Sequence, residues 1–142
     1  MIAGQRQKNE QQIKKYASCV GVSFQLIDDV LGVFGDGKKT GKGVGNDIRE
    51  GKKTKLVLDT FRTASKTERK FLSKMVGTDV NTQQLDKLRE LITSTGALES
   101  SLRLARQNAD LAIKTAKTLI TENNDVVTRL QQLADFVVRR EY

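Results

Sequence analysis

Apolar residues recur every three or four positions along most of the chain, which is the spacing of one face of an amphipathic helix. The pattern is first clear over Lys8–Leu31, where it predicts one long helix. The apolar positions of this helix are Ile13, Tyr16, Ala17, Val20, Phe24, Ile27 and Leu31. We expect it to end near Gly32 to Gly35, because glycine has a low helix propensity and readily adopts the left-handed conformation found beyond helix ends. The six glycines from Gly35 to Gly51 then predict a loop.

Helical spacing resumes after this loop and continues to the C-terminus. It predicts helices over Thr54–Ala64, from Thr67 to Gly77, from Asn81 or Thr82 to Gly96, over Ala97–Ile120, and from Asp125 to Val137. No segment alternates apolar and polar residues between turn signals, as a half-buried strand would. The pattern therefore predicts an all-α helical bundle, and a length of 142 residues suits a single domain over residues 1–142.

The composition limits the chemistry that such a bundle can perform. The chain has no histidine, so imidazole metal ligands and imidazole general bases are excluded. Cys19 is the only cysteine, which excludes an internal disulfide and a cysteine-based zinc site, and we expect it to pack in the core. No stretch approaches the roughly 18 consecutive apolar residues of a membrane span, and the first ten residues are too polar for a secretory signal. We therefore expect a cytoplasmic protein.

Charge draws attention to one region of the chain. The net charge is +8, and seven basic residues fall between Lys38 and Lys55 alone, which predicts a local anion site. Just before this segment, Gln25, Asp28 and Asp29 stand at i, i+3 and i+4, so a helix projects them from nearly one face. Adjacent carboxylates near an apolar helix end repel each other and lose solvation unless a cation compensates. Magnesium suits this role because it binds oxygen ligands and is commonly shared between carboxylates and a substrate phosphate.

Simpler explanations of these residues stay open at this point. Two aspartates near a helix end are often a solvated or capping feature, and a segment rich in glycine and lysine is often an exposed connector or a nonspecific nucleic-acid contact. The helix that carries the aspartates also reads as a plain core helix. The spacing of "GKGVGNDIREGKKT" excludes only the phosphate-binding P-loop, which requires Gly-x-x-x-x-Gly-Lys-Ser/Thr.

The order of the motifs is more specific than their spacing. "FQLIDD", then "TGK" with its lysine fourteen residues after Asp28, then "NDIREGKKT", closely resembles the second aspartate-rich region of the trans-isoprenyl diphosphate synthases, or polyprenyl synthetases. "IAGQ" near the start is similar to the end of the family's preceding helix, and "LADFVVRR" is similar to its closing helix, so the resemblance covers essentially the whole chain. It implies the C-terminal portion of the isoprenoid synthase fold.

The resemblance also implies an activity and a set of site residues. Members of the family are prenyltransferases of isoprenoid biosynthesis, and farnesyl- and geranylgeranyl-type enzymes carry out the magnesium-dependent condensation of an allylic diphosphate with isopentenyl diphosphate. Residue by residue, it implies Asp28 as the direct Mg²⁺ ligand, Asp29 as its supporting carboxylate, Gln25, Lys42 and Lys52 as diphosphate-binding residues, and Arg139 and Arg140 as a possible basic tail contact.

Two departures from the family pattern limit this expectation. Gly32 stands where the pattern Asp-Asp-x-x-Asp has its third aspartate, which predicts weaker metal binding. The family's first aspartate-rich motif does not occur in these 142 residues, so the chain holds one half of the metal site. We therefore expect it to be inactive alone and to associate with itself or with a complementary polypeptide that carries the first motif. Two alternatives are a non-catalytic helical subunit that modulates a complete synthase, and a basic helical nucleic-acid binder, which the local clustering of charge disfavours.

Overall fold

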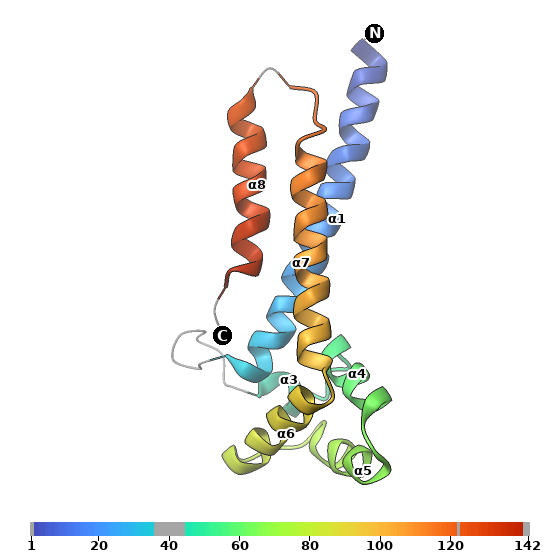
Figure 1. The fold of residues 1–142 in the computed structure, drawn as a ribbon, viewed down its shortest axis with the longest axis vertical. Coiled ribbons are helices and arrows are strands. Elements are labelled where there is room, and N and C mark those ends of the chain that lie inside the picture. Colours follow the sequence, from blue (N-terminus) through green and yellow to red (C-terminus); the bar gives the residue numbers. More distant parts are fainter. Residues whose placement is uncertain (1, 36–44, 122, 141–142) are drawn as a thin grey trace. The chain divides into compact units, whose positions relative to one another are not determined.

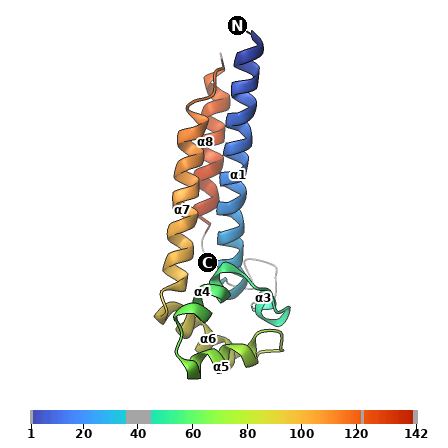
Figure 2. The ribbon, with the colours of Figure 1, turned by 90° about the vertical axis from the view of Figure 1, so that its right-hand side faces the viewer.

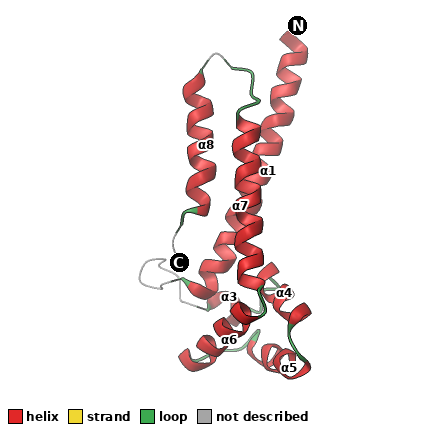
Figure 3. Cartoon of the chain, viewed as in Figure 1, coloured by secondary structure: helices red, strands yellow, loops and turns green. Residues whose placement is uncertain are grey.

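The chain is described here by a computed structural model that covers residues 2–35, 45–121 and 123–140 (Figure 1). These residues form helices and no strand (Figure 3), so the predicted all-α fold class is confirmed. The helices are α1 (Ile2–Phe34), α3 (Asn46–Arg49), α4 (Lys55–Thr63), α5 (Lys66–Met75), α6 (Thr82–Ser94), α7 (Ala97–Ala116) and α8 (Asn124–Val138).

Side-chain caps fix the starts of the short helices. The hydroxyl of Thr54 accepts a hydrogen bond from the backbone N–H of Val57 and starts α4, as predicted. Two capping boxes follow, in which the cap side chain and the third helical residue satisfy each other's backbone N–H groups. Ser65 and Glu68 form the box of α5, and Asn81 and Gln84 form that of α6. Asn81, one of the two residues predicted to start α6, is its cap, whereas α5 begins one residue before the predicted Thr67.

Other boundaries differ from the sequence-based expectation. The first helix begins at Ile2, well before Lys8, and continues to Phe34. The second long helix ends at Ala116 and does not reach Ile120. The last helix is capped by Asn123, whose side chain accepts from the N–H of Asp125, the residue predicted as the cap. The short helix α3 lies inside the segment predicted as a loop.

The chain divides into two compact units. The first comprises Met1–Ile27 and Leu104–Arg140. In it, segments of α1, α7 and α8 run side by side (Figures 1 and 2). Its core is made of Tyr16, Cys19, Ala112, Ala116 and Ala134, which confirms the predicted packing role of Cys19. The Tyr16 hydroxyl donates to the carbonyl of Leu130 (2.7 Å), and the Ser23 hydroxyl donates to that of Ala105 (2.8 Å). The single domain expected from the sequence stays a prediction.

The second unit comprises Asp28–Arg103 and has a larger aliphatic core. It contains the end of α1, the helices α3 to α6 and the beginning of α7. Its buried cluster consists of Val30, Val33, Ile48, Leu56, Val57, Ala64, Leu72, Val80, Leu85, Leu88, Leu91, Ile92 and Ala97. The end of α1 and the helix α3 both contribute to this cluster, so the core of the second unit fixes the stretch that carries the predicted site.

The long helix α1 contributes apolar residues to the cores of both units. By length and composition alone, the stretch Gly4–Phe34 is long and apolar enough to cross a membrane, a test that the core helix of a water-soluble protein also passes. Ile27, Val30 and Val33 of this helix are buried in protein. The predicted apolar face is nevertheless not buried throughout, because Ile13 and Phe24 are exposed.

Candidate functional site

The predicted carboxylate pair lies near the end of α1, in the second unit. Asp28 is half-buried, whereas Asp29 is buried, with only 8% of the residue exposed. Gln25, one turn earlier on the same helix, is exposed and belongs to the first unit. All three residues lie in α1, so the helical conformation expected for them is confirmed. A buried carboxylate next to a second one is unfavourable without a compensating positive charge.

The chain returns to the end of α1 directly before α3. Gly45 caps α3 with a left-handed backbone (φ 81°), and its N–H donates to the carbonyl of Gly32 at 3.0 Å. Ile48 in α3 is fully buried in the core of the second unit. One backbone hydrogen bond and one apolar anchor therefore hold α3 against the last turns of α1.

Lys52, one of the two predicted diphosphate lysines, follows α3. Its ammonium donates to the carboxylate of Asp47 at 2.6 Å and forms an ion pair with Glu50 at 2.9 Å. The hydrogen bond to Asp47, followed by that to Glu50, raises the pKa of Lys52 above its usual range. The lysine side chain remains 51% exposed, so its charge is positioned by carboxylates and is still accessible to a ligand.

Sequence reasoning missed Asp47 as a site residue. Its carboxylate lies against Gly32 of α1 and binds Lys52, so it joins the helix of the aspartates to the predicted anion-binding lysine. The signals available in the sequence were the acidic residue Asp47 in the stretch "NDIREGKK" and a glycine at the third position of the aspartate motif.

The remaining predicted site residues lie elsewhere. Lys42 falls outside the described residues. Arg139 and Arg140 belong to the first unit, where both have partners within the chain. Arg139 pairs with Asp135 at 2.6 Å, and the Arg140 guanidinium lies over the ring of Phe24 at 5.2 Å from its centre. Arg140 is thus held beside the residue that precedes Gln25.

The donor set at the end of α1 fits magnesium in one particular way. Magnesium is usually bound by one or two carboxylates, several waters and substrate phosphates, and seldom by a complete protein cage. Within residues 2–35, 45–121 and 123–140, no group of three or more histidine, cysteine, aspartate or glutamate side chains is arranged to hold a metal ion. Two carboxylates such as those of Asp28 and Asp29 match the donor type that magnesium takes from protein side chains.

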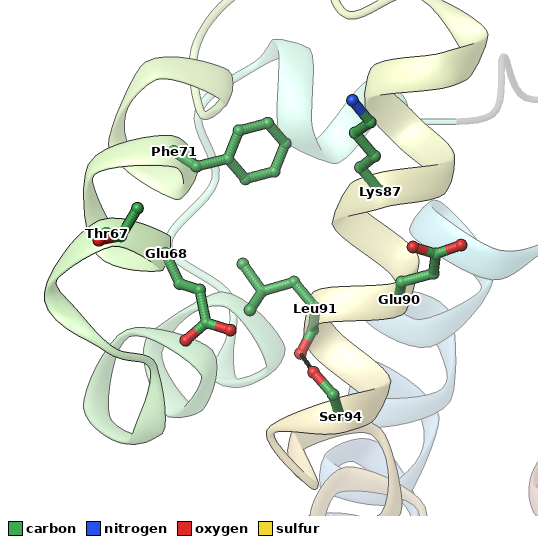
Figure 4. A pocket seen from close by; sticks show the side chains of 7 residues that line it. All are labelled: Thr67, Glu68, Phe71, Lys87, Glu90, Leu91 and Ser94. Atoms are coloured by element: carbon green, nitrogen blue, oxygen red, sulfur yellow. Dashed lines mark hydrogen bonds between the residues drawn. The ribbon is translucent and has the colours of Figure 1, made fainter.

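A pocket of about 450 Å³ lies away from these residues, between α5 and α6 of the second unit (Figure 4). Phe71 on α5 and Leu91 on α6 point toward each other across it, with Lys87 and Glu90 along the α6 side. No residue predicted as part of the site lines this pocket. Its apolar walls and opposite charges define no particular ligand.

The comparison with known families identifies the class to which this all-α chain belongs. Residues 1–94 match the family model described as polyprenyl synthetase. The match covers more than half of the 142 residues, so the chain belongs to the polyprenyl synthetase family. The resemblance seen in the sequence is thereby confirmed.

Individual relatives agree with this assignment. The chain is 36% identical over 136 residues to the geranylgeranyl diphosphate synthase of Saccharolobus solfataricus, covering 93% of this chain and 41% of that protein. It is 34% identical over 144 residues to the short chain isoprenyl diphosphate synthase of Methanocaldococcus jannaschii, covering 100% of this chain and 42% of the relative. The chain thus spans about two fifths of the length of these relatives.

Solved structures show the same fold. A crystal structure of the geranylgeranyl pyrophosphate synthase of Corynebacterium glutamicum, in complex with isoprenyl diphosphate and magnesium, superposes with a TM-score of 0.86 at 30% identity. The match covers 92% of this chain and 37% of that one. The geranylgeranyl pyrophosphate synthetase of Pyrococcus horikoshii superposes with a TM-score of 0.82 at 30% identity, covering 92% of this chain and 39% of that one. The expected isoprenoid synthase fold is therefore confirmed.

Proposed function

We propose that this chain forms one wall of the active site of a polyprenyl diphosphate synthase of the farnesyl or geranylgeranyl type. The reaction is the magnesium-dependent condensation of an allylic diphosphate with isopentenyl diphosphate. The observation that carries the proposal is the carboxylate pair at the end of α1, with Asp29 buried, in a chain whose family is known. We further propose that the chain works in the cytoplasm. We also propose that it is inactive alone, because it holds one of the two aspartate-rich motifs.

In this proposal each described side chain has one task. Asp28, half-buried, presents carboxylate oxygens as the direct metal ligand, and Asp29 supports it from the buried side. Lys52 places a positive charge against the diphosphate. When bound, magnesium would neutralise the diphosphate and stabilise the negative charge that develops on the leaving group. Gln25 and Lys42 complete the diphosphate contacts implied by the family resemblance, and Arg139 and Arg140 remain candidates for a tail contact.

Calorimetric titration of the chain with a bisphosphonate mimic of an allylic diphosphate tests the half-site. We expect binding with magnesium and much weaker binding without it. Asp28→Ala and Lys42→Ala should each weaken binding by about tenfold, the usual effect of losing one charged hydrogen bond. Asp110→Ala removes an exposed carboxylate of α7 in the first unit and serves as the matched control, with no change expected. An affinity that is unchanged without magnesium and unchanged in Asp28→Ala would overturn the proposal.

Condensation needs a second experiment. The chain is mixed with a polypeptide that carries the first aspartate-rich motif, and the transfer of labelled isopentenyl diphosphate is measured. We expect turnover only in the mixture, because two facing carboxylate clusters are needed to preorganise the charges around the diphosphate. Turnover by the chain alone would contradict the proposed division of the site.

A second candidate function is a non-catalytic helical subunit that pairs with a complete synthase and modulates it. The observation that favours it is the exposed apolar surface of α8, where Phe136 is 63% and Leu133 is 49% exposed. Under this alternative, the chain changes the rate of a complete synthase, and the variant Asp28→Ala does so as well. Loss of the effect in that variant would favour the active-site proposal.

A further inference from the structure

Gly32 and Asp47 fit each other closely. A Cβ atom placed on Gly32 would lie 2.5 Å from Oδ2 and 2.9 Å from Cγ of Asp47. Carbon atoms in ordinary van der Waals contact are about 3.5 to 4.0 Å apart, so no side chain at position 32 is compatible with this position of Asp47. The space that a side chain would occupy at the end of α1 is filled by the carboxylate of Asp47.

Several contacts hold Asp47 in this place. It is in the first turn of α3, whose cap residue Gly45 donates its N–H to the carbonyl of Gly32. The backbone carbonyl of Asp47 accepts from the N–H of Lys52 at 3.0 Å, and its Oδ1 accepts from the Lys52 ammonium at 2.6 Å. One carboxylate oxygen therefore faces Gly32 and the other holds Lys52.

The two members of the Asp47–Lys52 ion pair differ in solvent exposure. The Asp47 side chain is 14% exposed, whereas that of Lys52 is 51% exposed. A largely desolvated carboxylate requires a charged partner, and its charge-assisted hydrogen bond restricts the directions available to a flexible lysine. The ammonium is thus kept near the last turns of α1 while much of the lysine stays accessible.

We propose that Asp47 is a positioning residue for Lys52, and that glycine at position 32 is required for this arrangement. The position at which the family pattern has its third aspartate is here used by a carboxylate from α3. An aspartate at position 32 would complete the Asp-Asp-x-x-Asp pattern but would place a second carboxylate against Asp47. The effect on ligand binding rests on the proposed function, because it requires Lys52 to contact the diphosphate.

Thermal unfolding tests the fit without any ligand. Gly21 is also inside α1, and a Cβ there meets nothing within 4 Å, so Gly21→Ala is the matched control. Alanine favours a helix interior over glycine, and Gly21→Ala should raise Tm. Gly32→Ala should lower Tm or leave it unchanged in the wild-type chain, and should raise it like the control when Asp47→Ala is also present. An equal rise of Tm in both backgrounds would overturn the proposed fit.

Binding of inorganic diphosphate in the presence of magnesium tests the role of Lys52. Gly32→Asp should weaken binding by about tenfold, the loss expected when one charged hydrogen bond is misplaced. Asp47→Asn keeps the shape beside Gly32 but removes the charge, so binding should fall while Tm hardly changes. Asp47→Ala combined with Gly32→Asp should bind better than Gly32→Asp alone, because the two carboxylates no longer compete.

The outcomes separate this inference from the function on which it rests. Tighter binding by Gly32→Asp or by Asp47→Asn than by the wild-type chain would show that Asp47 opposes the ligand, and would overturn the positioning role. A wild-type chain that binds no diphosphate would refute the proposed function. The thermal comparison of Gly32→Ala with Gly21→Ala would in that case still decide whether Gly32 and Asp47 depend on each other.

Discussion

The two compact units use their large apolar residues in opposite ways. Among the largest fully buried side chains of the described residues, only Ser23 belongs to the first unit. Leu56, Leu72 and Leu88 are typical of the others, all of which lie in the second unit. The cluster of the first unit is built mainly from alanines around Tyr16 and Cys19. The unit that carries the aspartate pair thus has the better-developed aliphatic core.

The exposed surface shows the reverse distribution. Of the nine large hydrophobic side chains exposed within the described part of the chain, only Leu58 lies in the second unit. Single exposed apolar residues are ordinary, but their concentration on one unit is typical of a surface that contacts another protein. The second unit therefore packs most of its large apolar side chains in its own core, whereas the first carries most of the exposed ones, and we propose that a partner polypeptide or a second copy covers these.

The largest expected effect comes from removing one leucine from each core. Leu88 is fully buried in the second unit, and Leu88→Ala should lower the free energy of unfolding by about 2 to 5 kcal/mol. Leu130 packs against the cluster of the first unit but is half-buried, so Leu130→Ala should cost only about 1 kcal/mol. Urea unfolding followed by circular dichroism measures both values.

The exposed Leu58 of α4 provides the control for this pair. Leu58→Ala should change the free energy of unfolding by less than about 0.5 kcal/mol, because little apolar area is lost. If Leu130→Ala costs as much as Leu88→Ala, the contrast between the two cores is wrong.

Two buried serines, one in each unit, give a smaller and opposite pair of effects. The Ser23 hydroxyl donates to the carbonyl of Ala105, and Ser23→Ala should destabilise the protein by about 1 kcal/mol. Within the described residues, the buried Ser101 hydroxyl has no hydrogen-bond partner. Ser101→Ala removes that unsatisfied group and improves helix propensity, so it should stabilise by up to about 1 kcal/mol. Destabilisation by Ser101→Ala in the same urea assay would indicate a partner such as a buried water.

Local sequence signals predicted most of the fold. The helical spacing located the long helices, and Asn81, one of the two residues predicted to start α6, is its cap because asparagine is a favoured cap residue. The end of α7 was placed too late, at Ile120, because apolar spacing continues after the helix stops at Ala116. Spacing alone also overestimated burial, since Phe24 fits the apolar face of α1 but is 46% exposed.

The candidate site was predictable only in part, for a physical reason. Asp28 and Asp29 share one helix, so their common placement follows from helical geometry. The contact between Asp47 and Gly32 joins residues fifteen positions apart and depends on a left-handed turn at Gly45 and on the burial of Ile48. Nothing in local propensity specifies such a contact. Its traces in the sequence were a glycine at a motif position where a carboxylate is expected and an acidic residue, Asp47, in the stretch that follows.

The smallest expected effect is a pH dependence confined to the second unit. Glu68 accepts a hydrogen bond from the N–H of Ser65 in the capping box of α5, and its bonds to Ser65 lower the pKa of Glu68 below the ordinary 4.5. A carboxylate with a lowered pKa in the folded state contributes stability above its unfolded pKa, and this contribution is lost as the pH falls through the folded-state pKa. The capping box of α6 uses the neutral Gln84 and should show no such dependence.

Separate substitutions of Glu68 and Gln84 test whether the carboxylate of the capping box causes the pH dependence. Glu68→Gln should lower Tm slightly near neutral pH, and the difference from the wild-type chain should disappear as the pH falls through the lowered pKa of Glu68 and the carboxylate is protonated. Gln84→Glu should give α6 the same acid sensitivity, because its carboxylate would then accept from the N–H of Asn81. Since Glu68 lies on the surface, the shift should be smaller than that of either serine variant. A Tm difference for Glu68→Gln that persists unchanged into acid would mean that the charge of the capping box contributes nothing.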